Sequence, residues 1–97
     1  MNYIVFDLEW NQCPYGKGQE NERIPFEIIE IGAVKLNSER QIIDQYQILI
    51  QPRVYKKLHH RTREIIQMDM KLLEREGIPF YRAVKEFLKW SGEGALF

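Results

Sequence analysis

The chain has 97 residues, 44% of them hydrophobic, and its 14 Lys and Arg balance its 14 Asp and Glu. This length fits one small domain with a modest core, and the zero net charge excludes a global attraction to nucleic acid or acidic membranes, so that such binding needs a local patch. The single Cys13 excludes an internal disulfide, no apolar run approaches the roughly 20 residues of a membrane span, and no basic region of a signal peptide precedes the first apolar stretch. We therefore expect a cytoplasmic protein.

Three segments are predicted to be β-strands: residues 3–10, 27–36 and 41–50. The first two are nearly continuous apolar runs, which are typical of buried strands. The third alternates Tyr46 and Ile48 with Gln45 and Gln47, which is typical of a strand with one wet face.

The connections between these strands differ in character. Residues 11–26 hold two prolines, two glycines and many polar groups, which predicts a long loop. Loops of this length within a compact domain are usually functional or mobile. Residues 37–40 form a short polar turn, so we expect the second and third strands to make a hairpin.

The hydrophobic period changes in the second half of the chain. From Thr62 to Glu76, apolar residues recur with helical spacing, which predicts helix. The residues around Met68 also alternate, so a strand is the alternative there. Asp69 is suited to cap a second, shorter helix and would then divide this stretch into two.

Another helix is expected after Gly77, with Pro79 at its start and its end near Trp90. The last three residues, Ala-Leu-Phe, resemble the opening of a further strand. Three strands, two or three helices and the start of another strand indicate an α/β domain of which residues 1–97 would be the N-terminal portion.

Two acidic residues, Asp7 and Glu9, stand at the end of the first strand. Because side chains alternate along a strand, both carboxylates point to the same face, with their Cα atoms about 6.6–6.8 Å apart. Two such charges repel each other, and Mg²⁺ or Mn²⁺ would relieve the repulsion because these ions prefer carboxylate oxygens. The pair could equally be solvated or be neutralised by a nearby Lys or Arg. Asp7 follows four apolar residues, from Tyr3 to Phe6, so we expect it to sit deep.

The motif "IVFDLEWNQ", a polar loop and then "FEIIEIGAVKLN" resemble the first motif and second strand of the DEDD-type (DEDDh) 3′–5′ exonucleases, which share the RNase H-like fold. The segments "ILIQPRVYKKLHHRT" and "GIPFYRAVKEFLKW" are similar to the KapD-like and RNA-trimming branch of this family. The resemblance covers essentially the whole chain. It implies a mixed sheet with three antiparallel N-terminal strands in the order 3-2-1, with the remaining strands added beside the first.

The resemblance also implies a function. Asp7 and Glu9 would be catalytic residues that hold two Mg²⁺ or Mn²⁺ ions, and Leu8, Trp10 and Asn11 would contact the terminal nucleotide. The backbone near Trp10 would lie against that nucleotide, and an aromatic ring there can stack on any base. The reaction would be hydrolysis of the terminal phosphodiester of a single-stranded RNA or DNA 3′ end, releasing a nucleoside monophosphate.

The family also needs two further aspartates and a general base, usually His, which would lie outside these residues. His59 and His60 precede the last helix, where the family has no catalytic His, so we expect them to flank a helix start or touch phosphate, or simply to be solvated. This segment alone would then be inactive. The alternative is a degenerate, non-catalytic relative that serves as a binding or assembly module, for which the exposed sheet edge would favour self-association.

Three polar features have no role in these motifs. Glu30 lies inside an apolar run and needs a partner, either a hydrogen bond within the domain or a metal or substrate. Glu27 stands at a strand start, where we expect it to be exposed. Residues 53–63 hold five Lys or Arg and two His, so this segment is either a phosphate-binding patch or a solvated helix entry.

Overall fold

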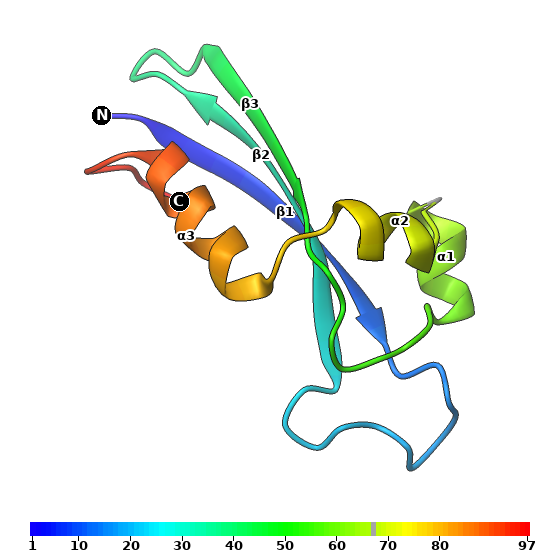
Figure 1. The fold of residues 1–97 in the computed structure, drawn as a ribbon. Coiled ribbons are helices and arrows are strands. Elements are labelled where there is room, and N and C mark those ends of the chain that lie inside the picture. The colour runs from blue at the N-terminus through cyan, green and yellow to red at the C-terminus, as the bar shows by residue number, and fades with distance from the viewer. Residues whose placement is uncertain (67) are drawn as a thin grey trace.

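The computed structural model describes residues 1–66 and 68–97; Gln67, in the predicted helical stretch, lies outside the described residues. Its elements follow in the order β1 (Tyr3–Gln12), β2 (Phe26–Leu36), β3 (Ile42–Leu49), α1 (His60–Ile66), α2 (Met70–Glu76) and α3 (Phe80–Ser91) (Figure 1). The strands form one antiparallel sheet in the order β1-β2-β3. The predicted α/β fold, with three antiparallel N-terminal strands followed by helices, is confirmed.

The β2–β3 hairpin is closed by Asn37, as the polar turn predicted. The Asn37 Oδ1 atom accepts hydrogen bonds from the backbone N–H groups of Glu39 and Gln41, both at 2.9 Å. Arg40 takes a φ of 65°, in the left-handed region that a tight turn often needs. The side chain of Asn37 thus supplies the hydrogen bonds that the turn backbone lacks.

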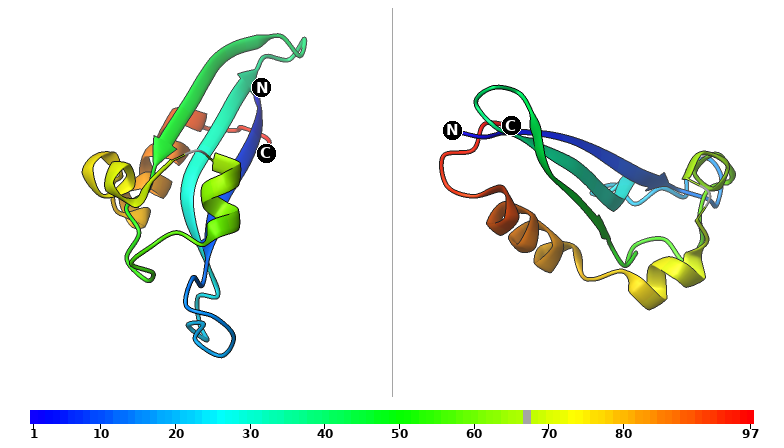
Figure 2. Two further views of the ribbon diagram at one scale, coloured as in Figure 1. Left: turned by 90° about the vertical axis from the view of Figure 1, so that its right-hand side faces the viewer. Right: turned by 90° about the horizontal axis from the view of Figure 1, so that it is seen from above.

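One face of the sheet packs against α3. The core on this side consists of Ile4 from β1, Ile31 from β2, Ile50 just after β3, and Ala83 and Phe87 from α3. Figure 2 shows α3 running along this face of the sheet. Because strand side chains alternate, the residues between these positions point to the other face.

A second core cluster lies on that other face, at the far end of the sheet. It contains Ile29, Leu58 and Leu73, with Leu49 and Met70 packed against them. Leu49 adjoins Ile48, which belongs to the α3-side cluster, so the two clusters lie on opposite faces of the strands. The helices α1 and α2 therefore cover only the end of this face and leave the rest open.

A β-bulge marks the place where this second cluster begins. In the β1–β2 register, Glu9 lies opposite Glu30, whereas Trp10 lies opposite Ile28, so Ile29 is the extra residue. Ile29 is completely buried in the second cluster. Such a bulge bends the strand and re-aims its side chains.

Between Thr62 and Glu76, the described residues form the end of α1, a non-helical Met68 and Asp69, and the whole of α2, with no strand, so the strand alternative is wrong. Asp69 is the N-cap of α2, as predicted, and its Oδ1 accepts the Leu72 N–H at 2.8 Å. No helix in the described part of the chain is long and apolar enough to cross a membrane.

Gly77, which follows α2, packs against the backbone at the end of β3. A Cβ atom at Gly77 would lie 2.6 Å from the backbone N of Gln51 and would also collide with the Leu73 carbonyl oxygen. The close approach allows hydrogen bonds from Gln51 N to Ile78 O at 2.8 Å and from Ile78 N to Leu49 O at 3.0 Å. Only glycine fits this position.

The end of the chain adds to the free edge of β1. Leu96 forms a parallel bridge with Tyr3, through hydrogen bonds from Ile4 N to Leu96 O at 2.7 Å and from Leu96 N to Asn2 O at 3.0 Å. The expectation that Ala-Leu-Phe opens another strand, placed beside the first, agrees with this bridge.

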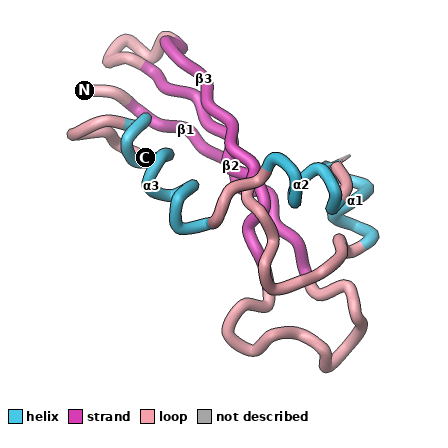
Figure 3. Tube along the Cα trace, in the orientation of Figure 1, coloured by secondary structure: helices cyan, strands magenta, loops and turns pink. Residues whose placement is uncertain are grey.

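The expectation for Glu27 was wrong. Its side chain is half-buried, and its two oxygens accept N–H groups from Arg53 at 2.7 Å, Val54 at 2.9 Å and Tyr55 at 3.3 Å. The segment that follows β3 therefore turns around this carboxylate. Figure 3 shows the loop between β1 and β2 beside this turn, and the Tyr55 hydroxyl ties the two together through the N–H of Asn21 at 3.2 Å.

Candidate metal and nucleic-acid site

The alternation of β1 places Asp7 and Glu9 on the sheet face opposite α3. Asp7 pairs across the sheet with Gly32, and a Cβ atom built there would meet nothing within 4 Å. Asp7 is exposed, and its Oδ1 accepts only the adjacent Leu8 N–H among the described hydrogen bonds, at 3.0 Å. The prediction that Asp7 sits deep was therefore wrong, because the helices leave this part of the face open.

Glu9 is half-buried and sits where the open face meets α1. Burial raises the pKa of its carboxyl, and the nearby charges of Asp7 and Glu30 raise it further. Among the residues that the structure describes, the only ion pair joins Arg82 and Glu86 on α3. Neither Asp7 nor Glu9 is neutralised by a basic side chain in that part of the chain, so the carboxylates repel each other.

Of the two alternatives for Glu30, the structure shows the hydrogen bond within the domain. The Gln47 Nε2 group on β3 donates a hydrogen bond to the Glu30 Oε2 atom at 2.7 Å. This contact crosses the open face of the sheet and keeps the Glu30 charge next to Glu9. The three carboxylates thus form a local concentration of negative charge in a chain of zero net charge.

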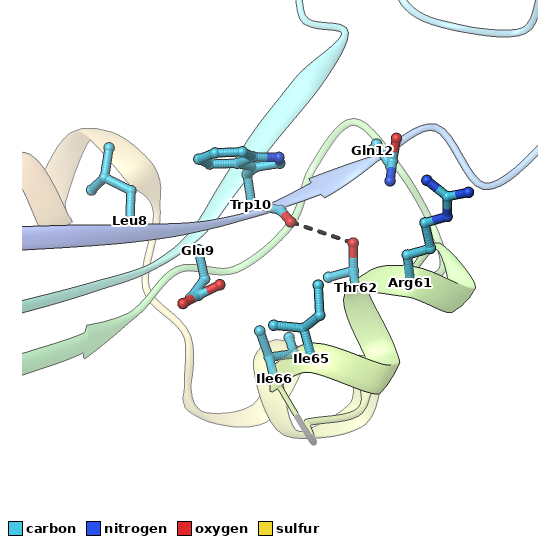
Figure 4. A pocket seen from close by; sticks show the side chains of 8 residues that line it. All are labelled: Leu8, Glu9, Trp10, Gln12, Arg61, Thr62, Ile65 and Ile66. Carbon is cyan, nitrogen blue, oxygen red and sulfur yellow. Dashed lines mark hydrogen bonds between the residues drawn. The ribbon is translucent and has the colours of Figure 1, made fainter.

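A cleft of about 180 Å³ lies beside Glu9. Its lining comes from two elements: Leu8, Glu9, Trp10 and Gln12 on β1, and Arg61, Thr62, Ile65 and Ile66 on α1. The Thr62 hydroxyl donates to the Trp10 carbonyl at 3.4 Å, which holds α1 against the strand (Figure 4). In Figure 4, the Glu9 carboxylate points toward α1, whereas the Trp10 ring lies on the other side of the strand.

The three residues predicted to contact a nucleotide have different surroundings. Trp10 is 53% exposed and packs edge-on against Phe26 at 6.3 Å between ring centroids, which leaves much of its surface available for stacking. Leu8 is half-buried and packs toward the α3-side core. Asn11 is fully buried, so any nucleotide contact from Asn11 would go through its backbone.

The Asn11 side chain instead holds the segment between β3 and α1. Its Nδ2 donates to the Lys57 carbonyl at 3.0 Å, and its Oδ1 accepts the His59 N–H at 2.9 Å. These two hydrogen bonds fix the approach to α1 only two residues after Glu9. Nothing in the local pattern around Asn11 indicates this role, because its partners lie 46 and 48 residues away.

The two histidines flank the start of α1, as expected. Their rings stack with centroids 4.3 Å apart, and the His59 Nδ1 accepts the Arg61 N–H at 3.1 Å. Burial lowers the pKa of His59, and the neighbouring His60 and Arg61 lower it further. His59 is therefore a neutral hydrogen-bond acceptor near neutral pH.

The residues present fit part of a magnesium or manganese site. Asp7 and Glu9 supply two oxygen ligands on one open face, and their mutual repulsion is the kind of electrostatic strain that a divalent cation relieves. Within residues 1–66 and 68–97, no group of three or more His, Cys, Asp and Glu side chains is arranged to hold a metal ion.

No protein-family model matches the sequence, and no curated protein matches it either. Several solved structures do match in fold. The nuclease domain of 3′hExo, a DEDDh family member bound to rAMP, aligns with a TM-score of 0.71 and 22% identity over 92% of this chain and 42% of its own. A 3′-exonuclease that recognises the histone mRNA stem-loop aligns with a TM-score of 0.72 and 22% identity over 93% of this chain and 38% of its own.

A third solved structure, cell-death related nuclease 4, aligns with a TM-score of 0.70 and 14% identity over 92% of this chain and 29% of its own. The chain therefore spans less than half of each of these proteins. Identities at this level show the fold alone, and the KapD-like and RNA-trimming branch stays a prediction. The chain has the RNase H-like fold of the DEDD-type 3′-exonucleases, of which it corresponds to the N-terminal part.

Proposed function

We propose that this chain carries the first metal-binding motif of a metal-dependent 3′–5′ exonuclease that hydrolyses the terminal phosphodiester of RNA or DNA. One observation carries the proposal: in a DEDD-type exonuclease fold, Asp7 and Glu9 share an open sheet face without a basic partner in the described part of the chain. Acids at a cleft that form no ion pair within the described residues are suited to bind a metal rather than to stabilise the fold.

Asp7 and Glu9 are the residues that would hold Mg²⁺ or Mn²⁺. When bound, such ions lower the pKa of the attacking water and neutralise charge on the leaving 3′-oxygen. Trp10 offers an exposed ring for stacking on a terminal base, which is compatible with any base identity. The remaining aspartates and the general base would come from outside residues 1–97, so these residues alone would bind metal weakly and release no nucleotide.

The solved relatives support the substrate class. One was crystallised with rAMP, and another is described as recognising the 3′ end of a histone mRNA stem-loop. A single-stranded 3′ end, with a nucleoside monophosphate as the product, is accordingly the substrate we propose.

The proposal is tested by hydrolysis of a 5′-labelled single-stranded oligonucleotide by the full-length protein that contains this chain. With Mn²⁺ or Mg²⁺, the wild type is expected to shorten the labelled oligonucleotide from its 3′ end, one nucleotide at a time. The Asp7→Asn variant is expected to leave the oligonucleotide intact. A 3′-blocked oligonucleotide should be resistant in both cases. Hydrolysis that persists in Asp7→Asn would contradict the proposal.

A non-catalytic binding or assembly module is the second candidate, and the exposed apolar residues beside β1 favour it. Phe6, Leu96 and Phe97 are 44%, 48% and 62% exposed, and they gather at the edge where Leu96 joins β1. Such an edge promotes self-association through strand pairing. Size-exclusion chromatography separates the two candidates: an obligate dimer without nuclease activity supports the module, whereas an active monomer excludes it.

A further inference from the structure

The basic segment before α1 forms a second cleft, separate from the one beside Glu9. This cleft has a volume of about 310 Å³ and is lined by Lys57, His60 and Arg63, together with Pro14, Leu58, Asp69 and Met70. We propose that it is a phosphate-binding site for the single-stranded nucleic acid whose 3′ end reaches Asp7 and Glu9. The inference rests on the proposed function and adds the path of the strand away from its end.

The charge at this cleft is predominantly positive. Lys57 and Arg63 take part in no ion pair within the described residues, where the single pair joins Arg82 and Glu86. Asp69 is the one acid in the lining, and its Oδ1 already accepts the Leu72 N–H as a helix cap. The two cations are therefore available to an anionic ligand, as a phosphate backbone requires.

The backbone that carries these cations is held in place by two side chains, Asn11 and Glu27. Asn11, itself fully buried, binds the carbonyl of Lys57 and the N–H of His59. Glu27 accepts three consecutive backbone N–H groups just before this segment. A site with a rigid backbone loses less conformational entropy when a ligand binds. A solvated helix entry would not need such anchoring to the strand that carries Asp7 and Glu9.

The two clefts lie on two sides of the same short helix. Arg61 and Thr62 line the cleft with Glu9, whereas His60 and Arg63 line the basic one. Because a helix with its side chains is about 10–12 Å across, a short stretch of single strand that passes over α1 can reach from one cleft to the other. The arrangement gives the strand a direction, with its end at the carboxylates and its phosphates on the other side of α1.

Aromatic groups beside the cations favour nucleic acid over an acidic protein. The Lys57 Nζ atom lies 5.6 Å from the centroid of the Tyr15 ring, and Tyr15 is exposed. Trp10 presents a second exposed ring next to the carboxylate cleft. Cations interleaved with exposed aromatic rings are typical of surfaces that bind single strands without sequence preference.

The test measures binding of a fluorescent single-stranded oligonucleotide to the full-length protein in EDTA, where metal-dependent contacts are absent. The double variant Lys57→Gln/Arg63→Gln is compared with Lys85→Gln/Lys89→Gln, which removes the same charge from α3. Loss of two phosphate contacts is expected to flatten the salt dependence of log K by about 1.4. Between 50 and 200 mM salt, the wild type should therefore lose about sevenfold more affinity than the Lys57/Arg63 variant.

The outcomes separate this inference from the proposed function. If both double variants weaken binding equally, or neither does, the phosphate site is refuted even where hydrolysis proceeds. If polyglutamate displaces the oligonucleotide as well as unlabelled oligonucleotide does, an acidic protein is the better ligand and the inference is overturned. If the Lys57/Arg63 variant alone loses salt-dependent binding while Asp7→Asn does not, the site stands, whether or not the protein hydrolyses its ligand.

Discussion

The two faces of the sheet use neighbouring residues of one strand for different purposes. On the α3 side, Ile4 is buried against Phe87, whereas on the other side Asp7 faces open space and Glu9 borders a cleft. The helices α1 and α2 cover only the end of that second face. A strand can therefore stabilise the fold with one set of alternate residues and leave the other set for chemistry.

The largest expected effect is on activity, from Asp7→Asn. The substitution removes a proposed metal ligand. Because mutation of a residue that only supports a metal ligand already lowers metal affinity or activity about 10–100-fold, we expect the rate of hydrolysis to fall by more than about 100-fold. The temperature of unfolding should not fall, because Asp7 is exposed and its neutralisation removes a repulsion with Glu9. Single-turnover hydrolysis and thermal melts measure the two quantities, with Glu39→Gln in the exposed hairpin turn as the charge-matched control.

The reciprocal change, Ile4→Ala, should affect the fold and spare the chemistry. Ile4 is 2% exposed in the α3-side core, so its truncation is expected to lower the free energy of unfolding by about 2–5 kcal/mol. Hydrolysis by the fraction that remains folded should match the wild type. Urea denaturation provides the free energy, and a variant as stable as the wild type would contradict this description of the core.

A third substitution, Asn11→Ala, tests the connection between the two regions. It leaves the Lys57 carbonyl and the His59 N–H without their buried partner, at a cost of about 1–3 kcal/mol for each group. Hydrogen exchange should accelerate first at residues 57–59. Hydrogen exchange at residues 57–59 that matches the wild type would contradict this role of Asn11.

The smallest expected effect is on the pH dependence of stability, through Glu9. Its pKa is raised in the folded state by burial and by Asp7 and Glu30, so the folded chain binds more protons than the unfolded chain between the ordinary and the raised pKa. The free energy of unfolding therefore falls as pH rises through that window and is constant above it. Glu9→Gln should abolish this fall and be more stable at neutral pH. Denaturation curves at pH 4 to 8 would contradict the assignment if both proteins showed the same slope.

Local patterns predicted the strands, the hairpin, the cap at Asp69 and the need of Glu30 for a partner. They did not predict the bulge at Ile29, the three N–H groups bound by Glu27, or the buried hydrogen bonds of Asn11. These features depend on pairings between residues far apart in the chain, which hydrophobic period and turn chemistry do not encode. The wrong prediction of a buried Asp7 has the same cause. Its apolar neighbours in the sequence indicated burial, but the face of the sheet that the helices cover depends on tertiary packing.

The central claim is that Asp7 and Glu9 together bind a divalent cation. Titration of the full-length protein with Mn²⁺, followed by electron paramagnetic resonance, measures this directly. We expect saturable binding by the wild type and its loss in Asp7→Asn/Glu9→Gln. Binding of equal affinity and stoichiometry in that double variant would contradict the claim.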